Sequence, residues 1–213
     1  MSNRYLGQVV HFLHEKYEGV RRWLNNEKVY YEIGGIVPPF DIDVSVELRS
    51  PAQIKLDKDC VIKARAILNG RSSFCKYGVE LGENTYVKEN CYFDAYDGFI
   101  RTKGFCAFGQ NTIIHGGGGV EIGKYVITGA NCYIISSNHQ YTSQDFPIML
   151  QGDRRKGIVI GENVWLGGSV IVLDGVNIGS NSVIGAGTVL TKSIPKNSVV
   201  YNDNNVITKT IYK

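Results

Sequence analysis

The last third of the chain repeats with a period of six residues, and this period limits the possible folds more than any other feature. From Ile160 the sequence reads IGENVW, LGGSVI, VLDGVN, IGSNSV, IGAGTV and LTKSIP. An aliphatic residue opens every unit, and Gly follows it in four of the six. The residue four places later is small or β-branched in each unit: Val164, Val170, Val176, Ser182, Thr188 and Ile194. A chance alternation of short strands does not persist over six units.

Such a unit is typical of a short strand followed by a tight corner. The aliphatic side chain points into a core and the β-branched one supports the strand, while Gly, Asn or Asp adopts the positive φ of the corner. Three units close one triangular coil, and coils stack at the strand spacing of about 4.8 Å. The sequence therefore predicts an all-β solenoid, a parallel β-helix.

The same pattern continues upstream with interruptions. Further units are headed by Leu81, Val87, Phe93, Ile122, Thr128 and Ile134. Residues 46–80 are β-rich with a looser repeat and are interpreted as the first coils. Residues 140–157 form a long polar break, which predicts a loop outside the coil, where functional residues often lie. We expect the β-helix to span 46–200 with this loop, and residues 201–213 to form a tail.

Residues 1–45 differ in kind from the repeats. Apolar residues recur there at steps of three and four, which is typical of an amphipathic helix: Leu6, Val9, Val10, Leu13, Tyr17, Val20 and Leu24. We expect this helix to cap the open end of the first coil. Contact of its basic face with an anionic membrane surface is the alternative.

Composition excludes several classes of protein. The net charge of +3 comes without a basic cluster among aromatics, so no nucleic-acid partner is expected. With no apolar signal sequence and no run of about 18 apolar residues, we expect a cytoplasmic protein without a transmembrane segment. Five cysteines without a CxxC pair argue against disulfides and a thiolate zinc site. Four recur every 15 or 16 residues and are predicted to stack as buried fillers: Cys60, Cys75, Cys91 and Cys106.

The segment from about residue 108 to residue 191 resembles the hexapeptide-repeat sugar O-acetyltransferases, such as the maltose, galactoside and capsule or lipopolysaccharide enzymes. The stretches that carry the resemblance are EIGKYVITGANCYIISSNHQY, a loop containing FP, and GIVIGENVWLGGSVIVLDGVNIGSNSVIGAGTVLTKSIP. It implies a left-handed coil, acetyl-CoA as co-substrate, no metal, and a homotrimer with its active sites in the clefts between subunits.

The resemblance also implies two catalytic groups. His139 of SSNH matches the catalytic histidine, which would take the proton from an acceptor hydroxyl, since imidazole titrates close to neutral pH. The backbone amide of Gly168 in WLGGS would stabilise the developing oxyanion. The family often has Ser at this position, but a backbone donor does not depend on the side chain.

Further positions match the coenzyme A groove of the family. Trp165 would lie beside the pantetheine arm, the backbones of Ala186 and Thr191 would face the groove, and Lys192 and Lys209 would meet the phosphates. Packing is the other interpretation of the tryptophan, and solvation that of the lysines. The ending YNDNNVITKTIYK replaces the Gly-x-Pro-Ala stretch usual in the family, so the nucleotide end of the coenzyme is left without its usual contacts.

The acceptor side departs from the family pattern. Where galactoside-type enzymes have an acidic pair, this chain has IIHGGGGVEIG. His115 is thus a candidate for binding a sugar hydroxyl or an anionic group, or else a structural histidine at a corner. Asn111, Tyr141 and Phe146 are further acceptor-binding candidates, although loop aromatics also anchor loops.

The expected function is O-acetylation of a sugar or surface-polysaccharide precursor. N-acetylation of an amino sugar or nucleotide amino sugar, and a non-catalytic binding scaffold, are the alternatives. A zinc hydrase of β-helix type would need three convergent histidines, and only His115 and His139 lie within the coil.

Overall fold

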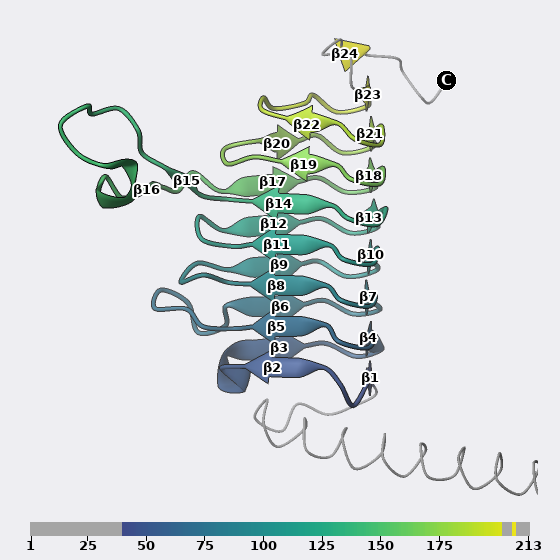
Figure 1. Ribbon diagram of the computed structural model, residues 1–213. Helices are drawn as coiled ribbons and strands as arrows, with labels where there is room; N and C mark the ends of the chain where they lie inside the picture. Colours follow the sequence, from purple (N-terminus) through teal and green to yellow (C-terminus); the bar gives the residue numbers. More distant parts are fainter. Residues whose placement is uncertain (1–39, 202–205, 208–213) are drawn as a thin grey trace, which may run out of the picture.

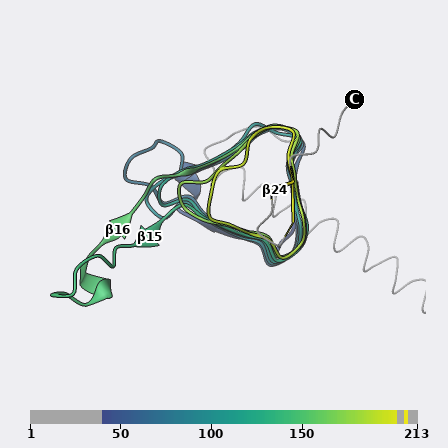
Figure 2. The ribbon, with the colours of Figure 1, turned by 90° about the horizontal axis from the view of Figure 1, so that it is seen from above.

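A computed structural model describes residues 40–201 and 206–207, which form a left-handed parallel β-helix (Figure 1). Viewed down its axis, the coil is a triangle with one long projection at a corner (Figure 2). The predicted parallel β-helix is therefore confirmed. The amphipathic helix expected within residues 1–45 lies outside the described residues. No helix in the described part of the chain is long and apolar enough to span a membrane.

Each side of the triangle is one sheet, and the chain visits the three sheets in turn. Sheet A consists of β1 (Phe40–Ile42), β4 (Cys60–Ile62), β7 (Tyr86–Val87), β10 (Ala107–Phe108), β13 (Ile127–Thr128), β18 (Trp165–Leu166), β21 (Val183–Ile184), β23 (Val199–Val200) and β24 (Val206–Ile207). Sheet B consists of β2 (Glu47–Arg49), β5 (Ile67–Asn69), β8 (Tyr92–Asp94), β11 (Ile113–His115), β14 (Tyr133–Ile135), β19 (Ile171–Val172) and β22 (Val189–Leu190). Sheet C consists of β3 (Ile54–Leu56), β6 (Val79–Leu81), β9 (Ile100–Thr102), β12 (Val120–Ile122), β17 (Ile158–Ile160) and β20 (Asn177–Ile178).

Two single turns of 3₁₀ helix and one hairpin complete the described structure. The helices are η1 (Pro51–Gln53) and η2 (Ile148–Leu150), and the hairpin strands are β15 (Asn138–His139) and β16 (Asp153–Arg154). Neighbouring strands within the three sheets are parallel, except that β24 runs antiparallel to β23. Sheet A begins with β1, before the start at residue 46 that the repeats predict, and β1 pairs in register with β4.

The residues that open the six-residue units form the core of the coil. Ile134 lies opposite Val172, which lies opposite Leu190, so equivalent residues of successive coils stack. All six residues that open the C-terminal units are buried: Ile160, Leu166, Val172, Ile178, Ile184 and Leu190. Upstream, Thr128 is only half-buried, whereas the other predicted heads are fully enclosed. The period therefore identifies the buried column of each sheet.

The corner between sheets C and A uses residues with positive φ. Asn163, Asn181 and Asn197 occupy it in three successive coils, and their side-chain amides form a ladder with N···O distances of 3.0 and 3.3 Å. Asparagine tolerates this left-handed conformation well. In lower coils the same corner holds two aromatic residues, Phe105 at φ 54° and Tyr125 at φ 60°.

The cysteines are structural, but the predicted stack is wrong. Burial raises the pKa of the Cys60 and Cys91 thiols to about 11, so both stay protonated and unreactive near neutral pH. The coils are longer than 15 or 16 residues, and Thr85 lies between Cys60 and Cys106 in the stack. Cys75 is only half-buried, in the excursion between β5 and β6.

Candidate active site

The long projection, here called the arm (residues 136–157), leaves the coil after β14 and returns at β17 (Figure 2). Its base is the antiparallel hairpin of β15 and β16, in which His139 lies directly opposite Asp153. Side chains directly opposite each other in such a pair lie on the same face of the hairpin. The imidazole Nδ1 of His139 is 2.9 Å from Oδ1 of Asp153. The loop predicted at residues 140–157 is therefore part of the arm, and the arm holds His139 paired with the carboxylate of Asp153.

Ser136, the first residue of the SSNH sequence, fixes the start of the arm. Ser136 is buried, and its hydroxyl donates to the carbonyl oxygen of His115 at 2.9 Å and accepts from the Gly118 amide at 3.0 Å. A Cβ atom at Gly118 would collide with the carbonyl oxygen of Ser136. Gly119 has a φ of 90°, and a Cβ there would lie 2.6 Å from the ring of Phe99. The glycine run after His115 thus gives the arm room to leave the coil.

A buried carboxylate fixes the end of the arm. Oδ1 of Asp174 accepts the backbone amides of Lys156 and Gly157 at 2.8 and 3.0 Å. Its Oδ2 makes no hydrogen bond within the described part of the chain, and the Nε of Arg154 lies 3.5 Å away. Because Asp174 belongs to the coil, it joins the returning strand of the arm to the rigid scaffold.

A cavity of about 320 Å³ opens beside the hairpin. Its walls come from sheet B, from the corner between sheets B and C, and from the base of the arm: Tyr96, His115, Tyr133, Ile135, Ser137, Asn138, His139 and Asp153. His115 is half-buried, with its ring 5.7 Å from that of Tyr96 and 6.5 Å from that of Tyr133, between centroids. The cavity thus joins two histidines, a carboxylate and two tyrosines.

The other predicted acceptor residues do not line this cavity. Asn111 lies at the corner between sheets A and B, where its side-chain amide bridges Asn90 and Asn131 at 3.0 Å each. This ladder and a φ of 58° account for the asparagine without any ligand. Tyr141 and Phe146 lie farther out on the arm, where 71% and 62% of their surfaces are exposed.

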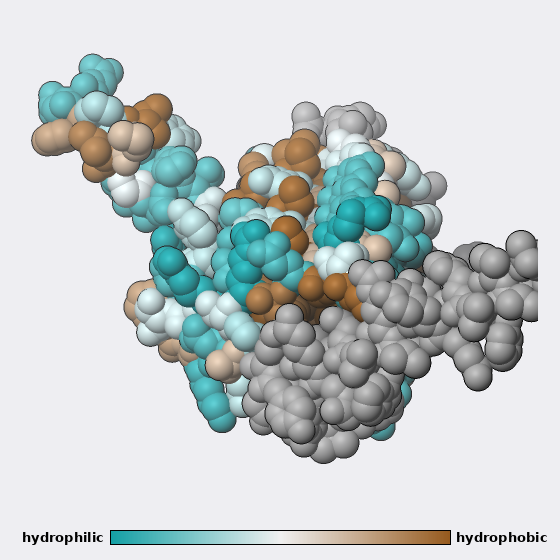
Figure 3. All heavy atoms as spheres, turned by 60° about the horizontal axis from the view of Figure 1, so that its bottom comes forward, coloured by the Kyte–Doolittle hydropathy of each residue, from teal (hydrophilic) through white to brown (hydrophobic). Residues whose placement is uncertain are grey.

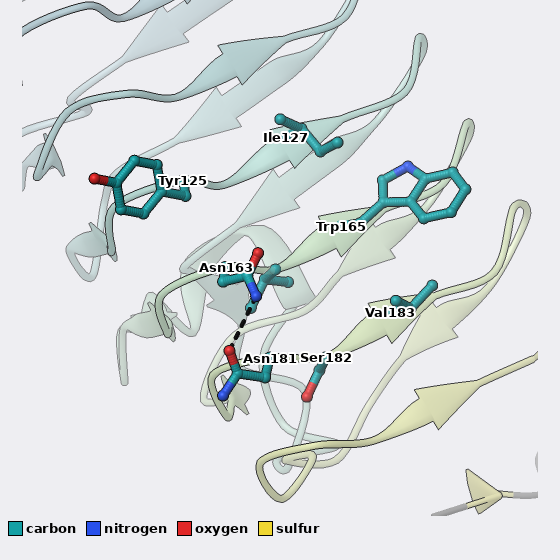
Figure 4. Close-up of a pocket in the computed structure, with 8 residues that line it drawn as sticks. Tyr125, Ile127, Asn163, Trp165, Asn181, Ser182 and Val183 are labelled. Atoms are coloured by element: carbon teal, nitrogen blue, oxygen red, sulfur yellow. Dashed lines mark hydrogen bonds between the residues drawn. The ribbon is translucent and has the colours of Figure 1, made fainter. Parts of the chain in front are cut away.

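Trp165 lies on the outside of sheet A, with 51% of its surface exposed. It stands between Ile127 and Val183 of the neighbouring coils, and Figure 4 shows this row together with Tyr125. A depression of about 110 Å³ follows the row. The corner that carries the arm lies opposite sheet A (Figure 2), so one chain does not bring Trp165 and His139 together.

Gly168 occupies the corner that follows Trp165, between sheets A and B. Its carbonyl oxygen accepts the Gly187 amide at 2.8 Å, whereas its own amide donates no hydrogen bond within the described residues. Ala130 and Ala186 lie at the equivalent corners of the adjacent coils, and their amides likewise donate to no residue in the described part of the chain. The corner between sheets A and B therefore carries a row of backbone amides that no described residue accepts, and the Gly168 amide is one of them.

The predicted coenzyme positions divide between two corners. Ala186 shares the corner of Gly168, whereas Thr191 and Lys192 are exposed after β22, at the corner between sheets B and C. Lys209 lies outside the described residues. Within the described ranges, no group of three or more His, Cys, Asp or Glu residues is arranged to hold a metal ion.

The structure also adds functional candidates that the sequence did not indicate. Asp153 and Tyr96 both line the cavity of His139. An acidic residue in a polar loop has no periodic signal, and only the register of the hairpin places Asp153 opposite the histidine. Tyr96 lies one coil below His115. Its ring reaches the cavity wall because its backbone has an unusual conformation with a positive φ.

Comparisons with known proteins bear on the fold and on the class of protein that the chain resembles. Residues 157–192 match the family model "Bacterial transferase hexapeptide (six repeats)". A galactoside O-acetyltransferase from Lactococcus lactis is 36% identical over 125 residues, which cover 57% of this chain and 58% of that protein. A galactoside O-acetyltransferase from Escherichia coli is 35% identical over 125 residues, covering 56% of this chain and 57% of that protein. The chain thus spans less than two thirds of the length of these relatives.

Among solved structures, AntD from Bacillus cereus has the same fold. A point mutant of this N-acyltransferase, in complex with dTDP and coenzyme A, superposes with a TM-score of 0.57 at 12% identity. The superposition covers 79% of this chain and 80% of that one. The chain therefore has the β-helix of the hexapeptide-repeat transferases, and its resemblance to the sugar O-acetyltransferases is confirmed.

Proposed function

We propose that the protein is an acetyl-CoA-dependent acetyltransferase that acts on a hydroxyl group of a sugar or surface-polysaccharide precursor. The observation that carries this proposal is the pair of His139 and Asp153 at the edge of a cavity of about 320 Å³. The similarity to two galactoside O-acetyltransferases supports the same chemistry. We also propose the cytoplasm as its location, because four buried cysteines stay unpaired.

His139 acts as the general base in this proposal. Asp153 accepts a hydrogen bond from the Nδ1–H of His139, which fixes the imidazole tautomer and leaves Nε2 to take the proton of the acceptor hydroxyl. Asp153 also stabilises the imidazolium that forms, as carboxylates do in catalytic triads. His115, in the same cavity, orients the acceptor. His139 then returns the proton to the departing thiolate.

The acetyl group is held on the other side of the reacting atoms. Acetyl-CoA supplies a thioester whose carbonyl oxygen becomes negative as the hydroxyl oxygen attacks. The free amide of Gly168 donates to that oxygen, and a fixed donor of this kind needs no reorganisation during the reaction. The exposed Trp165 packs against the pantetheine arm. Trp165 and the Gly168 amide together suit an extended, partly apolar ligand whose thioester end lies at the amide.

An assay of acetyl transfer to different acceptors tests the proposed activity directly. Purified protein is incubated with acetyl-CoA and a panel of sugars, amino sugars and nucleotide sugars, and free thiol and acetylated product are measured. We expect transfer to the oxygen of at least one sugar. Transfer only to amino groups would support the N-acetyltransferase alternative. Binding of acetyl-CoA without transfer to any acceptor would contradict the proposal.

A trimer completes the site in this proposal, because His139 and Trp165 lie on opposite sides of one coil. In the upper coils, the outward residues of sheets A and B are mostly apolar, with Ile127, Trp165 and Val189 each about half-exposed. The lower coils of sheet C instead carry the charged column Lys55, Glu80, Arg101 and Glu121. Sheets A and B are therefore the faces that suit contact with neighbouring subunits.

The arm has an apolar tip that also needs a partner. Figure 3 shows hydrophobic atoms gathered at the end of the projection, away from the body of the molecule. They belong to residues that are 55–81% exposed: Phe146, Ile148, Met149 and Leu150. Such clusters are uncommon on free surfaces and mark contact sites. We place this tip against a second copy of the chain.

We therefore expect a mass of three times the 23.6 kDa of the chain. Multi-angle light scattering at micromolar concentration measures it. Introducing charge at the arm tip by Met149→Asp should weaken the trimer, whereas Lys55→Asp on sheet C should leave its mass unchanged. A monomeric wild-type protein would contradict the intersubunit site.

A further inference from the structure

Tyr96 has a backbone conformation that large side chains avoid. Its φ is 47°, and the next residue, Asp97, also has a positive φ of 64°. In the left-handed region Gly and Asn are at ease, whereas a bulky aromatic residue is a genuine outlier. Such conformations persist where the surrounding structure enforces them, and they cluster at ligand sites.

A buried carboxylate two residues earlier in the chain enforces this conformation. Asp94 is 7% exposed, and its Oδ1 accepts the Tyr96 amide at 2.9 Å and the Asn69 side-chain amide at 3.1 Å. The hydroxyl of Tyr92 donates to its Oδ2 at 2.8 Å. Two other donors, one from each of two coils, thus hold Asp94, and Asp94 holds the backbone of Tyr96.

The second residue of the pair is fixed in the same way. Asp97 accepts hydrogen bonds from Arg71 at 3.4 Å and from Ser73 at 3.1 Å, and these contacts lower its pKa. Its own amide donates to the Arg71 carbonyl oxygen at 3.2 Å. The excursion between β5 and β6 therefore fixes the turn that carries the Tyr96 ring.

The turn places this ring in the wall of the His139 cavity. Tyr96 remains 44% exposed there, 5.7 Å from the His115 ring and 5.4 Å from the Arg155 guanidinium. Arg155 lies 3.5 Å from Asp153, the partner of His139. The ring is thus an aromatic wall that contacts His115 directly and approaches Asp153 through Arg155.

We propose that Tyr96 is the platform on which the acceptor sugar ring lies, and thus a residue that determines acceptor specificity. This inference rests on the proposed function and names a contact within the same site. The C–H groups on one face of a pyranose are weakly positive and match the negative face of an aromatic ring. A cavity of about 320 Å³ is at the lower end of small-molecule sites, so it suits a single sugar ring.

The test compares Tyr96→Asn and Tyr96→Phe with the wild type, using the best cyclic sugar from the acceptor panel. Asparagine accepts the left-handed conformation but has no ring, whereas phenylalanine keeps the ring. We expect Tyr96→Asn to raise the acceptor KM about tenfold, or about 1.4 kcal/mol, with kcat and the KM for acetyl-CoA nearly unchanged. Its melting temperature should not fall, because strain is relieved. Tyr96→Phe should keep the wild-type KM.

Phe105→Asn is the matched control, since Phe105 is also aromatic, with a φ of 54°, but lies at another corner. It should leave the acceptor KM unchanged. An open-chain sugar alcohol, if accepted, should show no Tyr96 effect, because it offers no ring face.

Wild-type transfer to a sugar establishes the proposed function before the variants are compared. If Tyr96→Asn then keeps the wild-type acceptor KM, or loses activity only as its melting temperature falls, the platform is refuted and the general function stands. Absence of transfer to any sugar by the wild type overturns both.

Discussion

Replacing His139 with alanine should reduce acetyl transfer by about 10²–10⁴-fold, the usual contribution of a general base. The side chain of His139 is 68% exposed and belongs to the hairpin, not to the buried column of a sheet. The melting temperature and the mass in solution should therefore change little. Initial rates at saturating acetyl-CoA, together with calorimetric titration of acetyl-CoA, separate loss of chemistry from loss of binding.

Two further variants distinguish the roles within the same cavity. Asp153→Asn keeps a side chain of equal size but removes the charge that fixes the imidazole tautomer, so kcat should fall, though less than in His139→Ala. His115→Ala should mainly raise the acceptor KM, because it removes an orienting contact. A correctly folded His139→Ala protein with full activity would refute the assignment of the base. Equal losses in the two alanine variants, with metal bound in the wild type, would favour a metal site instead.

Replacing Gly168 with proline should reduce kcat by about 10²–10³-fold, the usual cost of losing one oxyanion donor. Gly168 precedes Ser169, which has a φ of 58°, and proline is favoured at this first central position of a tight turn. The amide that the substitution removes donates no hydrogen bond within the described residues, so no backbone pairing of the coil is lost. The coil should remain folded, as circular dichroism and solution mass can verify.

Gly168→Ala is the matched control because it keeps the amide. A Cβ at this position would meet only the Ala130 carbonyl oxygen, at an ordinary distance of 3.5 Å. Alanine already occupies the equivalent corners of the coils below and above, at Ala130 and Ala186. Its activity should match the wild type. If the proline and alanine variants were equally active, the oxyanion donor would have to be sought elsewhere.

The sequence predicted the coil because each six-residue unit repeats the same local physics. Burial of Leu166, Val172 and Ile184 follows from their position in the unit alone. The cysteine stack failed because the coils differ in length, and spacing along the chain does not give the register between layers. Within residues 1–39, the predicted helix lies outside the described residues and stays a prediction.

The site was predicted only in part, for a related reason. His139 and Gly168 were found through a resemblance, and the structure places them on different corners of one chain. Asp153 depends on the register of a hairpin inside an aperiodic loop. Tyr96 depends on a conformation that hydrogen bonds from two other strands enforce. Neither is visible in composition or spacing, because both arise from contacts between distant segments.

The antiparallel pairing of β24 with β23 limits where further coils can be added to the β-helix. A parallel solenoid ends in a row of backbone groups that offers a template for the next coil, whether from the same chain or from another molecule. Strand β24 pairs antiparallel with that edge of sheet A and so interrupts the parallel progression. Duplicated units inserted between existing coils would find parallel neighbours on both sides, whereas a coil added beyond β23 would have to displace β24. At this end of the array, lengthening by repeat duplication is therefore easier between existing coils than beyond the last one, and end-to-end fibre formation is opposed along the edge of sheet A.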